Sequence, residues 1–210
     1  MGKEHPVDAA ATMSRTSAEG AAVIHSPAAE PPLRPPDWFE TPRLFARRPR
    51  EADAAAVFAA YASDPEATRY LAWRPYAKIE PLANFLRQRA AGWETGDGEY
   101  AYLLCHRGTD APIGSIGVMV DGARAMFGYV LGRAHWNRGY ATEALCYLVR
   151  WAAAEPRVLR AWAYCATENV ASARVMAKAG LQCEGVLRRW QMFPNLGPEP
   201  RDCVFYAQTK

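Results

Sequence analysis

The short turn at residues 137–142 has the composition of an anion-binding site. The apolar, strand-like run from Met126 to Leu131 precedes it, and a segment with helical periodicity follows it. The first N–H groups of a helix lack partners within the helix, and the helix dipole adds partial positive charge there. At Gly139 no Cβ would stand between the amides and a phosphate oxygen. The turn therefore predicts a diphosphate site, although small-residue turns before helices are common.

This turn and a second segment resemble the GNAT superfamily of N-acetyltransferases, and more narrowly its ribosomal-protein N-terminal acetyltransferase branch. Residues 136–144 match the branch's pattern Trp-x-x-Gly-x-Ala-Thr-Glu-Ala. The second segment follows a strand-like run and carries Asn169 and Ser172 in the pattern Asn-x-x-Ser. Its end matches Lys-x-Gly-Phe except that Leu181 replaces the Phe. The resemblance covers roughly residues 41 to 208, nearly the whole chain apart from its head.

The resemblance implies an enzyme that uses acetyl-CoA as co-substrate and transfers its acetyl group directly to a primary amine. Strands 126–131 and 158–166 would begin as parallel neighbours and then splay apart to admit the pantetheine arm. Asn169 would hydrogen-bond the arm, or it would only cap its helix. Arg138 would contact the phosphates. The expected acetyl-CoA contacts are Val130, Leu131, Asn137, Arg138, Gly139, Tyr140, Ala141, Thr142, Asn169 and Ser172.

The sequence departs from the superfamily at the positions of the proton donor and the base. Many superfamily members place a Tyr where this chain has Met176, so Ser172 is the remaining candidate for protonating the leaving thiolate. Ser172 could instead bond to its own helix backbone. Some relatives carry a carboxylate at the position of Gln191, which cannot usefully accept a proton. Water could deprotonate the amine without a dedicated base. The carboxylates that could otherwise replace it are Glu99, Glu168, Glu184 and Asp202.

The resemblance implies a primary amine as acceptor, either a peptide N-terminus or a small molecule. An α-amino group titrates near pH 8 and an alkyl amine near 10, so a lysine side chain needs more help from a base. By resemblance the acceptor pocket lies between residues 72–76 and 187–200. Its aromatic residues could equally be core or dimer contacts. The candidate acceptor residues are Trp73, Arg74, Tyr76, Trp190 and Gln191, with Phe193 and Asn195 beside them.

Two other functions compete with the transferase. A catalytically silent acyl-CoA-binding module is the alternative that the residues at 176 and 191 leave open. It would bind acetyl-CoA without releasing thiol in the presence of any amine. A generic nucleotide-binding protein explains neither Asn169 nor Ser172, and the turn lacks a P-loop Lys-Ser/Thr pair.

Composition fits a globular protein of the cytoplasm. The 210 residues are enough for one domain with a sizeable core, and the formal charge of +3 is too small to indicate nucleic acid or a membrane surface as partner. The five cysteines lack Cys-x-x-Cys spacing, which favours buried, reduced thiols. No apolar run is long enough to span a membrane, and no metal site is predicted. The chain could be a monomer or a homodimer.

The elements that position these residues predict an α/β fold. Residues 1–38 are rich in Ala and Pro and predict a flexible segment, and residues 39–210 a single domain. We expect a mixed, mostly antiparallel central sheet with helices on both faces. Helices are predicted at 51–63, 66–71, 80–93, 142–154 and 171–179, and strands at 43–48, 100–105, 113–120, 126–131, 158–166, 181–193 and 202–208.

Overall fold

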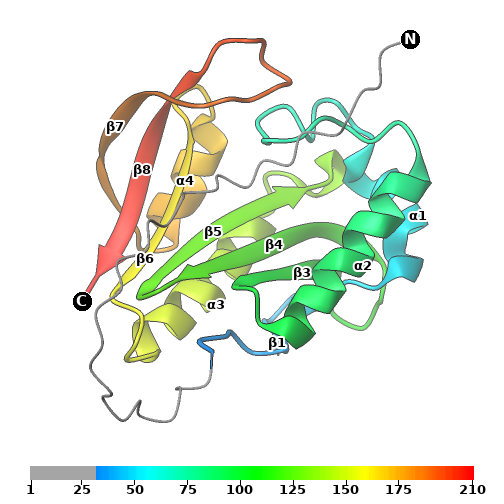
Figure 1. The fold of residues 1–210 in the computed structure, drawn as a ribbon, viewed down its shortest axis with the longest axis horizontal. Helices are drawn as coiled ribbons and strands as arrows, with labels where there is room; N and C mark the ends of the chain where they lie inside the picture. Colours follow the sequence, from blue (N-terminus) through cyan, green and yellow to red (C-terminus); the bar gives the residue numbers. More distant parts are fainter. Residues whose placement is uncertain (1–31) are drawn as a thin grey trace, which may run out of the picture. The chain divides into compact units, whose positions relative to one another are not determined.

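An eight-stranded sheet forms the centre of the computed structural model, which describes residues 32–210 (Figure 1). The strand order is β1-β2-β3-β4-β5-β6-β8-β7, and every neighbouring pair is antiparallel except β5 and β6. This confirms the predicted mixed, mostly antiparallel sheet. The strands are β1 Trp38–Glu40, β2 Leu44–Arg47, β3 Glu99–His106, β4 Pro112–Asp121, β5 Arg124–Leu131, β6 Arg160–Ala166, β7 Gln182–Gln191 and β8 Arg201–Thr209.

Helices cover both faces of the sheet (Figure 1). On one face, Leu82 and Leu86 of α2 pack with α1 and with Leu103 of β3. On the other face, the apolar side of α3, which includes Leu145 and Leu148, is buried and packs with Met176 of α4. The helices are η1 Glu51–Asp53, α1 Ala54–Val57, η2 Phe58–Ala62, α2 Ile79–Thr95, η3 Arg133–His135, α3 Tyr140–Ala154 and α4 Val170–Lys178.

The predicted helix at 66–71 is wrong, because this stretch forms turns. The Asp64 carboxylate accepts the Glu66 N–H at 2.9 Å, and the Thr68 hydroxyl donates to the Asp64 carbonyl at 2.8 Å. Asp and Thr side chains compete in this way with helical hydrogen bonds. Strand β1, with only three residues, was not predicted.

The parallel strands β5 and β6 pair only at their first residues. The register joins Arg124 to Arg160, Ala125 to Ala161 and Met126 to Trp162. Beyond this point β5 remains paired with β4, and β6 with β8. The two strands therefore diverge, as Figure 1 shows, and this agrees with the splayed pair that the resemblance implies.

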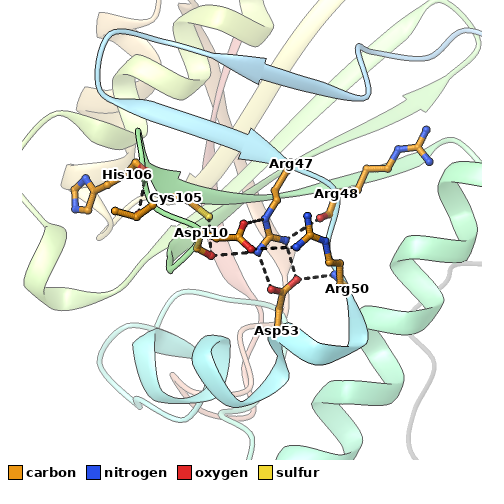
Figure 2. Close-up of polar contacts among 8 residues, drawn as sticks. Arg47, Arg48, Arg50, Asp53, Cys105, His106 and Asp110 are labelled. Atoms are coloured by element: carbon orange, nitrogen blue, oxygen red, sulfur yellow. Dashed lines mark hydrogen bonds and ion pairs between the residues drawn. The ribbon is translucent and has the colours of Figure 1, made fainter.

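The buried Arg47, at the end of β2, forms hydrogen bonds that connect this strand to neighbouring parts of the fold (Figure 2). Arg47 is 4% exposed and donates to both oxygens of Asp53, at 2.7 and 2.8 Å. It also bonds to the carboxylate of Asp110 in the turn between β3 and β4. The hydrogen bonds that Arg47 donates to Asp53 and Asp110 raise the pKa of Arg47 against the effect of burial. Removing one partner of such a pair typically costs about 3–5 kcal/mol of stability.

The start of the described chain is anchored to the domain. The Tyr100 hydroxyl donates to the Leu33 carbonyl at 3.3 Å, and the Tyr102 hydroxyl donates to the Pro36 carbonyl. Leu33 packs against the cluster beneath α3. Residues 32–38, which composition assigned to a flexible segment, therefore lie on the domain. The rest of that segment, residues 1–31, lies outside the described residues.

Two further features bear on the predictions from composition. All five cysteines are free, but Cys183 is exposed and Cys146 half-buried, so the prediction of five buried thiols is wrong for these two. Among residues 32–210, no helix is both long and apolar enough to span a bilayer.

Candidate active site

The turn before α3 has a backbone that turns several N–H groups to one side. Asn137 and Gly139 have positive φ angles of 57° and 80°, and Gly139 is the N-cap of α3. Alternating left-handed and right-handed residues gather successive N–H groups into an anion-binding concavity. The Trp136 indole donates to the Leu131 carbonyl at 2.8 Å, which fixes the turn to the end of β5.

The main-chain N–H groups of this turn are unpaired. Within residues 32–210, none of the six N–H groups from Asn137 to Thr142 donates a hydrogen bond. The first internal bond of the helix runs from the Glu143 N–H to the Gly139 carbonyl at 3.0 Å. These donors lie at the positive end of a helix of 15 residues. The turn can therefore hold an anion with several oxygens.

The Arg43 side chain stabilises the turn through contacts with three residues in or next to it. Its guanidinium donates to the Arg138 carbonyl at 2.8 Å and to the Glu143 carboxylate at 2.6 Å, and it lies over the Tyr140 ring at 4.6 Å. The Thr41 hydroxyl also donates to Glu143, at 2.6 Å. Burial opposes the ionisation of Glu143, but the bonds from Thr41 and Arg43 outweigh it and lower the pKa of that carboxyl. Glu143 thus lies in the first turn of α3 and also anchors that turn to Thr41 and Arg43.

Ser172 is held by a tyrosine that the sequence did not single out. The Tyr129 hydroxyl, on β5, donates to the Ser172 carbonyl oxygen at 3.1 Å and lies 2.8 Å from Ser172 Oγ, where either hydroxyl can be the donor. Burial raises the pKa of Tyr129, so it stays protonated. When Tyr129 donates to Ser172 Oγ, the serine's own proton is free to point elsewhere.

Asn169 is the N-cap of α4. Its Oδ1 accepts the Ser172 N–H at 3.1 Å, so the capping interpretation is confirmed. Its Nδ2 has no partner among the described residues and can still donate to a ligand. The two roles considered for Asn169 therefore use different atoms and are compatible.

The nearby cysteine is a poor nucleophile. Burial raises the pKa of Cys165 to about 11, and its Sγ lies 3.5 Å from the Asn169 carbonyl oxygen. Only the thiolate attacks a thioester effectively. The arrangement therefore favours direct transfer over an acetyl-cysteine intermediate.

None of the candidate bases is free. Each carboxylate is paired with an arginine side chain or main-chain N–H. For Glu184, the hydrogen bond from Arg160 lowers the pKa, which weakens this carboxylate as a base. Gln191 accepts from the Tyr164 hydroxyl at 3.1 Å. The pairs are Glu168 with Arg201 at 3.7 Å, Glu184 with Arg160 at 2.9 Å, Asp202 with the Arg189 N–H at 2.8 Å, and Glu99 with Arg89 beside α2.

The two segments predicted to border the acceptor do meet. Asn195 Nδ2 donates to the carbonyls of Thr68 and Trp73, at 2.8 Å each. Trp73 and Tyr76 pack against the α1–α2 cluster with their rings 5.6 Å apart, so they are partly core residues. Arg74 is exposed, and Phe193 is buried. Trp190 is half-exposed beside Phe205.

Comparison with known proteins identifies the class. A GNAT acetyltransferase domain model matches residues 43–182. YoaA of Bacillus subtilis, described as an uncharacterized N-acetyltransferase, is 33% identical over 175 residues, which are 82% of this chain and 96% of YoaA. The chain belongs to the GNAT acetyltransferase family and is an N-acyltransferase. The family and its named relatives give no support to a catalytically silent module.

Solved structures agree on the fold. A GNAT-family acetyltransferase from Bacillus anthracis superposes with a TM-score of 0.71 at 24% identity, over 82% of this chain and 98% of its own. RimL, a ribosomal L7/L12 α-N-protein acetyltransferase in complex with coenzyme A, gives 0.71 at 18% identity, over 80% of this chain and 95% of its own. At these identities the likeness concerns the fold alone.

Proposed function

We propose that this chain transfers the acetyl group of acetyl-CoA directly to a primary amine of low basicity. The observation that carries the proposal is the row of six unpaired N–H groups at residues 137–142, beside two diverging strands. A diphosphate would accept these hydrogen bonds at the positive end of α3. The pantetheine arm would lie between β5 and β6, along the main chain of Val130 and Leu131. Asn169 Nδ2 would donate to it.

Ser172 would stabilise the departing sulfur. The amine nitrogen attacks the thioester carbon, the C–S bond breaks, the nitrogen loses a proton and the thiolate gains one. The Ser172 hydroxyl would donate a hydrogen bond to the developing thiolate. The Tyr129 hydroxyl would at the same time donate a hydrogen bond to Ser172 Oγ. Tyr129 does not need to ionise in this scheme, which agrees with its raised pKa.

The acceptor would be an α-amine, of a peptide N-terminus or of a small molecule. The four candidate bases are paired with arginine side chains or an arginine N–H. Without a free base, the enzyme depends on the fraction of amine that is already neutral. That fraction is about 100-fold larger for an amine of pKa 8 than for one of pKa 10 at neutral pH. An α-amine therefore suits this site better than a lysine side chain.

Thiol release from acetyl-CoA, measured with a panel of amines, tests the proposal. The panel contains peptides with free α-amines, the same peptides with acetylated N-termini and one internal lysine, and small α-amines. We expect release with free α-amines and little with the lysine-only peptides. Binding of acetyl-CoA without release for any amine would contradict the proposed transfer.

A further inference from the structure

Three aromatic rings form a ladder on β6 and β8. Tyr164 and Phe205 face each other across the two strands with ring centroids 5.2 Å apart and planes 14° apart. Trp162 lies 5.8 Å from Phe205 with planes 12° apart. All three side chains are partly exposed. Because Ala161, Ala163 and Cys165 pack into the cluster with α3 and α4, the alternation along β6 puts Trp162 and Tyr164 on the opposite face.

A bulge in β7 adds a fourth ring. The pairing of β7 with β8 shifts between Leu187 and Gln191, and Arg189 in this stretch has φ 48°. The Arg189 N–H is held by Asp202 at 2.8 Å. The next residue, Trp190, stands with its ring at 85° to Phe205, at 5.3 Å, and is 50% exposed. Bulges and left-handed non-glycine residues of this kind re-aim side chains and cluster near binding sites.

The ladder begins where the proposed pantetheine cleft opens. Trp162 pairs with Met126 at the last shared position of β5 and β6. Tyr164 lies two residues further along the diverging strand and donates to Gln191. Tyr164 and Phe205 also pack against a small buried cluster of Ala166, Phe193 and Cys203, as does Tyr70 from the turns after η2. The rings therefore lie between the opening of β5 and β6 and the segment 187–200, which contains Asn195.

The charges around the ladder do not favour a polycation. Glu184 and Glu199 are neutralised by Arg160 and Arg189, at 2.9 and 2.7 Å. Aromatic rings arranged in parallel, with one ring edge-on, bind another planar ring through offset stacking and edge contacts. The chemistry of this face therefore matches a planar, uncharged group.

We propose that the acceptor carries a planar aromatic group near its amine, and that Trp190 and the ladder Trp162–Tyr164–Phe205 bind this group. The proposal rests on the proposed transferase function and specifies the acceptor class. Trp190 determines specificity, because the bulge orients it against the ladder while its exposed face remains available.

Two amines matched in size test the aromatic requirement: phenylalanine amide and cyclohexylalanine amide. Their binding to the protein in the presence of coenzyme A is measured by calorimetry. We expect about fivefold tighter binding of the aromatic amide, since an aromatic pair contributes beyond its apolar area. The Trp190→Leu variant should bring this ratio close to one. Trp38→Leu is the control, because Trp38 is also an exposed tryptophan next to a phenylalanine, on the opposite edge strand.

Equal binding of the two amides to the native protein, or a ratio unchanged in Trp190→Leu, would overturn the proposal. Light scattering on both variants adds a further arm. If Trp190→Leu dissociates a dimer and leaves the ratio intact, the patch joins two copies of the chain and the proposal is wrong. Thiol release is measured with the same amides. No release with either counts against the transferase function, whereas equal rates with both count against the ladder.

Discussion

The two halves of the proposed site recognise their ligands with different parts of the chain. The acetyl-CoA half, at residues 137–142 and along β5, presents main-chain N–H groups. The acceptor half, on β6, β7 and β8, presents side chains, chiefly aromatic rings. Main-chain recognition depends on backbone conformation and small residues. Side-chain recognition depends on which rings occupy one sheet face, so it can change from one chain to another while the first half is kept.

The two halves also differ in how the rest of the protein holds them in place. The turn before α3 is held by Arg43 and Glu143, whose bonds of 2.6 to 2.9 Å fix its backbone from the side of β2. The acceptor half is assembled from an irregular edge strand and two loops joined by Asn195. Substitutions in the first half should therefore act on acetyl-CoA, and those in the second on the amine.

The largest effect is expected for Gly139→Asp. A Cβ there would lie 3.4 Å from Arg43 Nη2, so the new carboxylate would compete for the guanidinium that supports the turn and would add negative charge close to the diphosphate site. A residue with a side chain is also strained at φ 80°. Calorimetry should show acetyl-CoA affinity reduced on the order of 100-fold or more. Gly108→Asp is the matched control, because Gly108 has φ 82° with open space around it. Equal affinities of the two variants would contradict the diphosphate site.

Ser172→Ala should reduce kcat by about 100-fold and change acetyl-CoA affinity little, because the hydroxyl acts on the sulfur only as the C–S bond breaks. Steady-state kinetics and calorimetry on the same variant separate the two quantities. Unchanged turnover would mean that a group other than Ser172 stabilises the departing sulfur.

Arg43→Ala should weaken acetyl-CoA binding by about tenfold, since the turn loses charge-assisted bonds to Arg138 and Glu143. The KM of the amine should stay the same. Arg107→Ala, which removes a surface pair with Glu40, is the control for loss of an arginine. A rise in amine KM would mean that the two halves are not supported separately.

The smallest effect is expected for Tyr129→Phe. The phenylalanine keeps the packing but removes the donor to Ser172, so kcat should fall by about fivefold. The change should add little to Ser172→Ala in the double variant, because both act through one hydroxyl. Additive losses would separate Tyr129 from Ser172.

Local motifs predicted the strand–turn–helix arrangement around residues 137–142. Gly139 and the following small residues specify a turn conformation within a few positions, so the sequence indicates the unpaired N–H groups directly. The contacts that hold the turn could not be predicted in this way. Arg43 and Glu143 are 100 residues apart in the chain, and Tyr129 and Ser172 are 43 apart. No local pattern specifies which side chains meet across such separations.

In the acceptor half, local sequence patterns also could not predict which strands lie next to each other. Alternation along β6 indicates that Trp162 and Tyr164 share a face. The insertion of β8 between β6 and β7, which brings Phe205 to Tyr164, follows from tertiary packing. The bulge at Arg189 depends on the Asp202 side chain on the neighbouring strand. The short strand β1 was missed because three residues are too few to show alternation.

The most direct test follows the six amides themselves. Amide ¹H–¹⁵N chemical shifts of the ¹⁵N-labelled protein can be recorded as acetyl-CoA is added. We predict that the signals of residues 137–142 shift most and saturate together with binding. Saturable binding of acetyl-CoA that leaves these six signals in place would contradict the diphosphate site before α3.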